Sequence, residues 1–512
     1  MPTVTVSKVN RSLVITWDAG VKNLFPDAPV LPPLQGETGS IVLPHELRTT
    51  LLLRHLGMNI PNPMLEYYDW RGGAPFHVQR MTCDLLSTSA RAYCLNDLGT
   101  GKTRAVLWAW DWLNRTGYAN KMLVVCPIST MNFVWAREVF ATVPDRTVKI
   151  LYGTKVQRLK TLSEEADIYV INHDGLKTIA DELVKRLDID LLAIDELAVY
   201  RNNSDRSKLM RKFATRFTWV WGMTGEPMPN APTDIWSQCK IITPASVPQY
   251  FRQARDQLMI HQSQFKWVPK ANATEQAFAM MQPAVRFNLD DVVELPEVVY
   301  RTIDVDMTHQ QKAVYETLVK EFKVMVAEKA ITAVNAAAAM NKLLQVSLGR
   351  VYTAAPEFIT LDSTPRKQTL LDLVEDAAQK VLVFVPYRHV VDELHEFLTN
   401  QGIEHTVVHG DTPQKVRDQE FNLFQNTAKY KVLLAHPQCL AHGITLTAAS
   451  TIIWYGPTPS LEIYDQANAR IRRVGQKNRQ QVLHLQSTPV ERKIYSLLRS
   501  KQNVQDKLLQ MF

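Results

Sequence analysis

The clearest chemical pattern in the chain is a short glycine-rich segment near residue 100. Its residues are Gly99, Thr100, Gly101, Lys102 and Thr103, and an apolar, helix-compatible run follows them. In a phosphate-binding loop, glycines let backbone N–H groups face the phosphates, a lysine reaches the β- and γ-phosphates, and a hydroxyl holds magnesium. Asn96 stands where the full motif has its first glycine, so this segment alone leaves a chance Gly-Lys-Thr turn open.

Two adjacent acids, Asp195 and Glu196, come directly after an apolar run typical of a buried strand. Adjacent acids at such a position are costly unless a cation or a reaction requires them. We expect Asp195 to hold magnesium through water, and Glu196 to orient and deprotonate an attacking water. With the glycine-rich loop before it, the pair favours nucleotide hydrolysis over an acidic turn.

A third motif near the end of the chain contains Gln466, Arg470 and Arg473. The two arginines are three residues apart, which predicts that they share one helical face. A guanidinium aimed at the charge that develops on a transferred phosphate lowers the barrier to that transfer. A solvated basic face is the alternative, and it suits the other basic residues of this segment better. Arginines that complete a site carried by a distant lobe would couple hydrolysis to closure of a cleft, as in a motor.

Short apolar runs that suit strands buried on both faces of a parallel sheet surround these motifs. Such runs lie between residues 121 and 223 and again between 380 and 486, and the patterns from about 240 to 370 are long and helical. Alternating segments and then prolines open the chain, which predicts a small β-containing module and a linker. The closing segment is amphipathic, and we expect it to pack back on a lobe.

These patterns predict an α/β fold with two lobes, a helical segment between them and a small N-terminal module. A chain of 512 residues is long enough for several cores. The predicted units are an N-terminal accessory module (1–70), lobe 1 with the nucleotide site (71–240), the inter-lobe segment (241–370), lobe 2 (371–490) and a C-terminal helix (491–512). The module carries no chemical motif, and we expect a role in substrate targeting because its composition differs from the rest.

Composition excludes several classes of protein. Apolar residues make up 46% and charged residues 21% of the chain, which is ordinary for a globular protein. No window reaches about 18 uncharged apolar residues, so no membrane span is expected, and the first residues lack a secretory pattern. The net charge of +7 mildly favours a polyanionic partner.

Neither the cysteines nor the histidines form a metal-binding pattern. The five cysteines contain no Cys-x-x-Cys pair, so they suit buried small residues in a reducing compartment. His405 and His409 have a ligand-like spacing, but no second pair matches them. We therefore expect no disulfide framework and no zinc site.

The ordered motifs resemble those of superfamily-two helicase-like ATPases, and several details resemble the Swi/Snf-like (Snf-two) branch. The resemblance covers about residues 70 to 510 and rests on segments such as LNDLGTGKT, AIDELAVYRN, GMTGEPMPN and QANARIRRVGQ. The segment DVVELPEVVYRTIDVDMTHQQKAVYETL is similar to the inter-lobe segment of that branch. The compact size and short insertions are closer to phage or bacterial members than to chromatin remodellers.

The resemblance implies two RecA-like lobes that bind ATP and Mg²⁺ between them. By position in the motifs, Gln79 reads the adenine, Lys102 and Thr103 hold the phosphates and magnesium, and Asp195 and Glu196 keep the roles given above. The residues implied on the lobe-2 side of the ATP site are Gly443, Gln466, Arg470 and Arg473.

The same resemblance implies where nucleic acid is held. The residues that match backbone-contacting motif positions are Pro127, Ile128, Asn172, His173, His409 and Gly410. Thr224 and Gly225 match the segment that links the ATP state to the grip on DNA.

Four positions depart from the motifs of the branch. Ala198 replaces the usual histidine, His442 a glycine, Thr445 an asparagine and Gly456 an aspartate. We expect these changes to affect coupling between DNA contact and hydrolysis, and to leave the phosphate chemistry intact.

The resemblance implies a DNA-dependent ATPase that translocates on, or remodels, duplex or branched DNA. Binding should be salt-sensitive and largely independent of sequence, because backbone contacts carry no sequence information. We expect a monomer that acts in replication, recombination or repair beside the proteins of those processes, in the cytoplasm of a bacterial or phage-infected cell and not at a membrane. The alternatives are an RNA-directed helicase, a motor subunit of a restriction or defence complex, and a non-hydrolysing nucleic-acid clamp.

Overall fold

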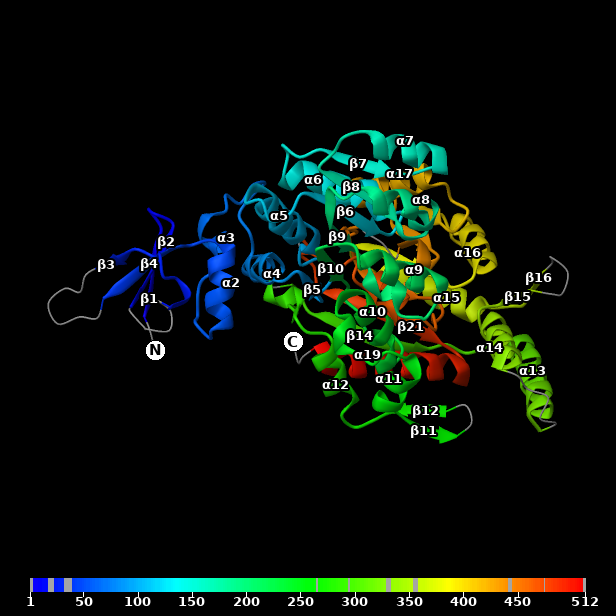
Figure 1. The fold of residues 1–512 in the computed structure, drawn as a ribbon. Helices are drawn as coiled ribbons and strands as arrows, with labels where there is room; N and C mark the ends of the chain where they lie inside the picture. The colour runs from blue at the N-terminus through cyan, green and yellow to red at the C-terminus, as the bar shows by residue number, and fades with distance from the viewer. Residues whose placement is uncertain are drawn as a thin grey trace.

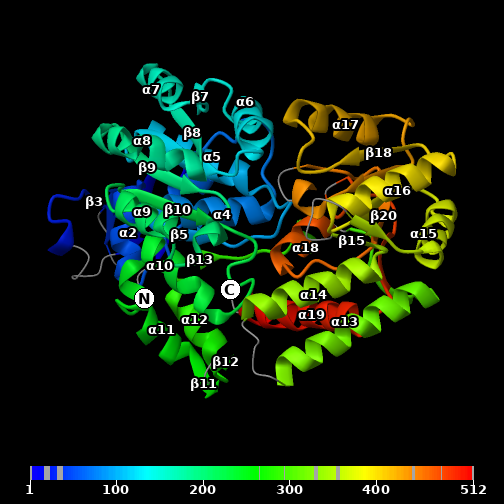
Figure 2. The same ribbon diagram turned by 90° about the vertical axis from the view of Figure 1, so that its right-hand side faces the viewer.

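Two lobes, each built around a parallel sheet, lie side by side, and a small β-containing module flanks the first of them (Figures 1 and 2). A computed structural model describes residues 3–16, 23–31, 39–263, 266–292, 295–327, 333–352, 358–440, 444–473 and 475–509. The predicted α/β fold with two lobes and an N-terminal β-containing module is confirmed.

The N-terminal module is an antiparallel sheet that packs on helix α2. Its elements are β1 (Val4–Ser7), β2 (Ser12–Thr16), β3 (Val30–Leu31), β4 (Ser40–Pro44), α2 (Leu47–His55) and α3 (Pro63–Tyr67), with the strand order β1-β2-β4-β3. Period-two alternation places Leu13, Ile15, Ile41 and Leu43 on one face of the sheet, where they pack against Leu53 of α2. The module lies to one side of lobe 1, away from lobe 2 (Figure 1).

Lobe 1 contains a seven-stranded parallel sheet with helices on both faces. In the order β13-β5-β10-β9-β6-β8-β7, its strands are Ala284–Val285, Arg91–Cys94, Trp219–Met223, Ile189–Ile194, Lys121–Cys126, Ile168–Asn172 and Val148–Leu151. One face is covered by α4 (His77–Thr88), α5 (Lys102–Arg115), η1 (Met131–Ala136) and α6 (Arg137–Thr142). The other is covered by α7 (Lys155–Ser163), α8 (His173–Lys185), α9 (Asp205–Ala214) and α10 (Ile235–Ile242). Burial on both faces explains the continuous apolar runs of the central strands.

Several short helices and strands complete lobe 1. They are η2 (Leu197–Tyr200), η3 (Pro232–Asp234), η4 (Pro244–Ser246), α11 (Phe251–Leu258), β11 (Met259–Ser263), β12 (Lys266–Pro269), α12 (Ala273–Met280) and η5 (Leu289–Asp291). Strands β11 and β12 pair only with each other, and α12 contributes Ala277 and Met280 to the lobe-1 core.

Lobe 2 repeats the plan with six parallel strands. In the order β14-β21-β20-β17-β19-β18, they are Val298–Asp304, Gln480–Gln486, Ala449–Trp454, Lys380–Phe384, Val432–Ala435 and His405–Val408. One face is covered by α15 (Thr364–Asp376) and α16 (Arg388–Asn400), and the other by α17 (Gln414–Asn426), α18 (Leu461–Asn468) and α19 (Pro489–Leu509). The remaining elements are α13 (His309–Ala327), α14 (Ala333–Ser347), β15 (Arg350–Tyr352), β16 (Phe358–Thr360) and η6 (Pro437–Leu440).

The segment that we expected to be helical between the lobes also supplies strands to both sheets. β13 pairs with β5 of lobe 1, and β14 pairs with β21 of lobe 2 along its whole length. Neither strand has a strong sequence signal, because β13 has only two residues and β14 is an edge strand whose side chains are partly or fully exposed.

The last helix, α19, connects the two lobes. Its side chains Ile494, Tyr495 and Leu498 belong to the lobe-2 core, and the helix also contacts α12 of lobe 1. A buried ion pair between Arg366 and Glu491, 2.7 Å long, anchors its start. In Figure 2 it runs beside α14 below lobe 2. The closing segment therefore packs back on both lobes.

Four of the cysteines are buried, whereas Cys439 is partly exposed, and all five are free. His405 Nε2 lies 2.7 Å from Nδ1 of His395. Within the described ranges, no three His, Cys, Asp or Glu side chains gather as a metal site, and no helix is long and apolar enough to cross a membrane.

Candidate active site

The glycine-rich loop joins β5 to α5, which is the strand–loop–helix context that a phosphate-binding loop requires. Gly99 and Gly101 have φ values of +89° and +80°, which favour glycine. A Cβ at Gly101 would lie 2.1 Å from Nε2 of Gln79, so a larger residue there would displace the end of that side chain. Helix α5 begins at Lys102, and its positive N-terminal end adds to the lysine charge.

Asn96, at the position of the missing glycine, anchors the loop. Its side-chain nitrogen donates to Oγ1 of Thr82 at 2.8 Å, and its side-chain oxygen accepts from the backbone N–H of Phe287 at 3.0 Å. The Lys102 ammonium donates to the carbonyls of Asn96 (2.7 Å) and Asp97 (3.3 Å). The asparagine therefore has a structural role, and its hydrogen bonds hold the glycine-rich loop in place without the first glycine.

Asp195 and Glu196 follow β9 at the edge of the sheet where the loop lies. Asp195 Oδ2 accepts a hydrogen bond of 3.0 Å from the indole N–H of Trp135, and Oδ1 accepts one of 3.1 Å from the Glu196 backbone. Glu196 has a φ of +53°, which is unusual for a residue with a side chain. Such strain concentrates at functional sites, where the surrounding structure enforces it.

Electrostatics make Glu196 a suitable proton acceptor. Burial, and next the neighbouring Asp195 carboxylate, raise the pKa of Glu196 to about 7, while Lys102 and Arg470 act in the opposite direction. Burial also raises the pKa of Asp195, against the hydrogen bond from Trp135 and the charge of Lys102. A general base with a pKa near cellular pH combines availability with basicity.

The two arginines of lobe 2 do not share a helical face, so that prediction is wrong. Helix α18 ends at Asn468, and the chain then turns into the lobe, where Leu446 donates its N–H to the Arg470 carbonyl at 3.0 Å. The Arg470 guanidinium, only 1% exposed, donates to the carbonyls of Gln466 (2.7 Å) and Ile444 (3.2 Å). These bonds fix the arginine outside the helix.

Both arginines nevertheless face the nucleotide elements of lobe 1. A Cβ at Gly99 would lie 3.8 Å from Cγ of Arg473, so this side chain lies on the loop. The positive charge of Arg470 lowers the pKa of Glu196, against the larger upward effects of burial and Asp195. An ion pair of 2.8 Å between Arg201 and Glu462 also joins the lobes. A cleft of about 340 Å³, lined by residues of both lobes, lies beside these contacts.

Of the other residues predicted at the nucleotide site, the structure describes Gln79 and Gln466. Gln79 lies in the first turn of α4, where its Oε1 accepts from the Phe76 backbone at 2.9 Å and its Nε2 donates to the Gly101 carbonyl at 3.4 Å. Gln466 is buried in α18. Gly443, together with the departure at His442, lies outside the described residues.

The residues predicted to contact nucleic acid all lie at the ends of strands or just beyond them. Pro127 and Ile128 follow β6, Asn172 ends β8, His173 begins α8, Thr224 follows β10, and His409 and Gly410 follow β18. Of these, Ile128 and Gly410 are exposed and Asn172 and His409 are partly exposed, whereas Pro127, His173 and Thr224 are buried. His173 contacts the Tyr200 hydroxyl at 2.9 Å, and Thr224 accepts the Glu226 N–H at 3.1 Å. His173 and Thr224 thus have contacts that keep their side chains inside lobe 1.

The sequence reasoning missed several residues of this site. Trp135 reaches Asp195 from a helix with no motif of its own, and Arg201, which ends the acidic motif, contacts lobe 2. Arg286 donates to the carboxylate of Asp97 at 2.5 Å and so braces the loop. Burial, and next Asp465, raise the pKa of Glu226 well above its usual range. Only Arg201 had a usable signal, because it lies within a recognised motif.

Two of the departures have a structural explanation. Thr445 Oγ1 accepts a hydrogen bond of 3.2 Å from Arg473, so it still orients that side chain. A Cβ at Gly456 would lie 2.8 Å from a methyl group of Leu348, so the inter-lobe segment leaves no room for the usual aspartate. Ala198 is buried in η2.

Substituting Gly456 with alanine should destabilise the protein by about 1–3 kcal/mol, because the added methyl group overpacks the contact with Leu348. Gly410→Ala is the matched control, since its Cβ would meet no atom within 4 Å. Urea unfolding of both variants measures the effect. Equal stability of the two variants would contradict it, and the losses of Gly456→Ala and Leu348→Ala should be less than additive when combined.

The residues present fit a nucleotide with magnesium. Asp195 and Thr103 offer the hard oxygen ligands that Mg²⁺ prefers, and such sites use only one or two protein ligands beside the phosphates. When bound, magnesium would neutralise charge on the phosphates and hold them in place. Lys102 and the backbone N–H groups of the glycine-rich loop would hold the phosphate oxygens.

Trp135→Phe should raise the magnesium concentration needed for half-maximal ATP hydrolysis by about tenfold, because Asp195 loses the donor that orients it. Trp110→Phe removes the same volume from a fully buried tryptophan whose indole donates to the Asn120 carbonyl instead. A magnesium titration of hydrolysis compares the two variants. The expectation fails if the Trp110 and Trp135 variants respond alike.

Two family models match the chain. The model of the SNF2-related domain matches residues 94–357, and the model of the helicase conserved C-terminal domain matches residues 365–475. The first match includes Lys102, Asp195 and Glu196, and the second includes Arg470 and Arg473. Among solved structures, the Sulfolobus solfataricus SWI2/SNF2 ATPase core in complex with dsDNA is similar at a TM-score of 0.42 and 19% identity, over 87% of this chain and 95% of that chain.

Several curated proteins are similar in sequence. The putative protein p41 of Acyrthosiphon pisum secondary endosymbiont phage 1 is 24% identical over 417 residues, 76% of this chain and 85% of the phage protein. The ISWI chromatin-remodeling complex ATPase CHR17 of Arabidopsis thaliana is 24% identical over 425 residues, 76% of this chain and 37% of the relative. The SWI/SNF-related matrix-associated actin-dependent regulator of chromatin subfamily A-like protein 1 of Drosophila melanogaster is 22% identical over 454 residues, 85% of this chain and 55% of the relative. The chain thus spans most of the phage relative but less than two thirds of the other two.

Proposed function

The chain belongs to the SNF2-related family of ATPases, and we propose that it uses ATP hydrolysis to move along duplex or branched DNA. The observation that carries the proposal is the division of one site between two lobes. Lys102, Asp195 and Glu196 belong to lobe 1, whereas Arg470 and Arg473 belong to lobe 2, where Arg473 lies against Gly99 of the loop and the charge of Arg470 lowers the pKa of Glu196. A site of this kind is complete only while the lobes are closed, so each turnover would close and open them.

Each side chain has one task in this proposal. Lys102 binds the β- and γ-phosphates, and Glu196 accepts a proton from the attacking water. Arg470 stabilises the charge that develops on the transferred phosphate, and Arg473, whose side chain lies on the phosphate loop, orients the same group. The ion pair between Arg201 and Glu462 favours the closed arrangement.

The exposed residues among those predicted to contact nucleic acid are suited to binding a DNA backbone. Ile128, Asn172, His409 and Gly410 follow parallel strands and are accessible, so a strand could run across both lobes. Contacts of this kind carry affinity without sequence information, which makes binding salt-sensitive. We place the activity in replication, recombination or repair in the cytoplasm of a bacterial or phage-infected cell, with the chain acting as a monomer.

Steady-state ATP hydrolysis with a panel of nucleic acids tests the proposal. The panel contains no nucleic acid, single-stranded DNA, blunt duplex, forked DNA and duplex RNA. Duplex or forked DNA should stimulate the rate strongly, and Glu196→Gln should abolish it. A rate that is independent of nucleic acid, or stimulated by RNA alone, would overturn DNA as the track.

A further inference from the structure

A second cavity, of about 540 Å³, lies at the junction of the N-terminal module and lobe 1. We propose that it binds an unpaired nucleotide of a DNA strand, with the base on aromatic rings and the phosphate beside arginines. The cavity has the size of an ordinary ligand pocket and lies between domains, where such pockets are frequent. The inference rests on the proposed function for DNA as the partner, and it specifies that partner as DNA with single-stranded parts.

One wall of the pocket is aromatic. Trp112, near the end of α5, and Tyr118, just beyond it, have nearly parallel rings with an interplanar angle of 12° and centroids 6.4 Å apart. The Tyr118 hydroxyl accepts the backbone N–H of Arg48 at 3.3 Å, which joins this wall to α2 of the module. Aromatic faces bind bases by stacking, and stacking tolerates any base because each has a π-face.

The opposite side of the pocket belongs to the module and is held in place by hydrogen bonds. His45 Nε2 donates to the Pro61 carbonyl at 2.8 Å, since a carbonyl can only accept. In neutral His45, Nδ1 is therefore an acceptor, and the Tyr67 hydroxyl donates to it at 2.7 Å. Tyr67 thus presents its ring to the pocket in a fixed orientation.

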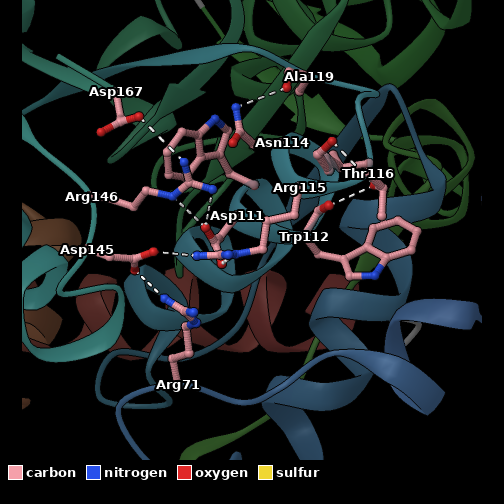
Figure 3. Close-up of polar contacts among 12 residues, drawn as sticks. Arg71, Asp111, Trp112, Asn114, Arg115, Thr116, Ala119, Asp145, Arg146 and Asp167 are labelled. Atoms are coloured by element: carbon pink, nitrogen blue, oxygen red, sulfur yellow. Dashed lines mark hydrogen bonds and ion pairs between the residues drawn. The ribbon is translucent and has the colours of Figure 1, made fainter.

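Arginines supply positive charge around these rings. The Arg11 guanidinium lies 5.2 Å from the centre of the Tyr67 ring, and no acidic side chain among the described residues pairs with it. Arg71 and Arg115 both contact the carboxylate of Asp145 (Figure 3). A guanidinium has five N–H donors, so both retain donors for a phosphate. Because Asp145 and Asp111 offset the charges of Arg71 and Arg115, Arg11 is the arginine of this lining that offers its charge to a phosphate.

The pocket is connected to the nucleotide site by a single helix. Helix α5 begins at Lys102 in the phosphate loop and ends at Arg115 in the pocket. Its far end is fixed by Asp111, which is fully buried and accepts hydrogen bonds from Arg115 (2.7 Å) and Arg146 (2.7 Å) (Figure 3). Asp111 also accepts a hydrogen bond of 2.8 Å from Tyr68. A strand in the pocket would therefore contact the same rigid element as the phosphates of ATP.

The test measures binding of a short single-stranded oligonucleotide that carries a fluorescent adenine analogue, whose emission falls on stacking. The pocket variants are Arg11→Glu and Tyr118→Ala. Their matched controls, Arg252→Glu and Tyr250→Ala, change exposed side chains of lobe 1 outside the pocket. Arg11 is exposed, so its variant keeps the test valid even if Tyr118→Ala alters folding.

Tyr118→Ala should weaken binding about tenfold through lost stacking. Arg11→Glu should lower the slope of log affinity against log salt by about 0.7, the share of one phosphate contact on a single strand. Both controls should bind like the unaltered chain. Affinities and salt slopes that are the same in all variants would overturn the proposal.

A competition experiment distinguishes the two ligands that offer a base and a phosphate, a DNA strand and a free nucleotide. The free nucleoside monophosphate of the same analogue should compete only weakly, because the strand offers additional phosphates. Competition equal to that of the oligonucleotide would overturn a DNA strand as the ligand. Hydrolysis stimulated by blunt duplex is measured separately on the unaltered chain. Absent stimulation together with pocket-dependent oligonucleotide binding would overturn movement on DNA and leave the pocket assignment in place.

Discussion

Arg470→Ala should lower kcat for DNA-stimulated ATP hydrolysis by about 10³-fold, as expected when an arginine that stabilises phosphoryl transfer is removed. The KM for ATP should change little, because an interaction made only in the transition state contributes to kcat. The structural basis is a fully buried guanidinium of lobe 2, whose positive charge lowers the pKa of Glu196, the proposed base in lobe 1. Steady-state kinetics at saturating duplex DNA measure both parameters.

Arg472→Ala is the matched control for this prediction. Arg472 lies two residues further along, is 41% exposed and pairs with Asp290 at 2.7 Å, so its loss should leave kcat nearly unchanged. Arg470→Lys sharpens the comparison, because lysine keeps the charge but not the fork of donors that reaches Gln466 and Ile444. Similar kcat values for the Arg470 and Arg472 variants would show that lobe 2 does not complete the site.

Glu196→Gln should reduce kcat by about 10³-fold, the contribution typical of a positioned general base. The substitution keeps the size of the side chain and removes the carboxylate that accepts the proton. Binding of ATP should persist, because the phosphate loop and Lys102 remain. Steady-state hydrolysis and the affinity for a fluorescent ATP analogue separate the two effects.

Glu226→Gln provides the control for that substitution. Glu226 is a second acid, in the lining of the cleft, and desolvation together with Asp465 raises its pKa well above the usual range, which favours the neutral form that glutamine resembles. Replacing it with glutamine should therefore change hydrolysis little. If hydrolysis fell more in the Glu226 variant than in the Glu196 variant, the assignment of Glu196 as the base would be wrong.

The central strands of both lobes could be predicted because burial on both faces leaves a continuous apolar run in the sequence. Strand β6, for example, is buried at every position after its first. The loop at Lys102 and the acids after β9 could also be predicted, since parallel topology brings the carboxyl ends of strands to one edge. These are local signals that the fold preserves.

The contacts that complete the site could not be predicted in the same way. The bond from Trp135 to Asp195 and the approach of Arg473 to Gly99 join segments far apart in the chain. The spacing of Arg470 and Arg473 suggested a helical face, but hydrogen bonds with Leu446 and Ile444 turn the chain out of the helix. Tertiary contacts determine where these side chains lie, and a local sequence pattern carries no information about such contacts.

The central claim is that hydrolysis moves this chain along DNA. The most direct measurement is displacement of a third strand, bound in the major groove of a duplex, by the unaltered chain and by Glu196→Gln. We predict displacement by the unaltered chain with ATP, and none with a non-hydrolysable analogue or with the variant. Strong stimulation of hydrolysis by the duplex without displacement of the third strand would contradict the account.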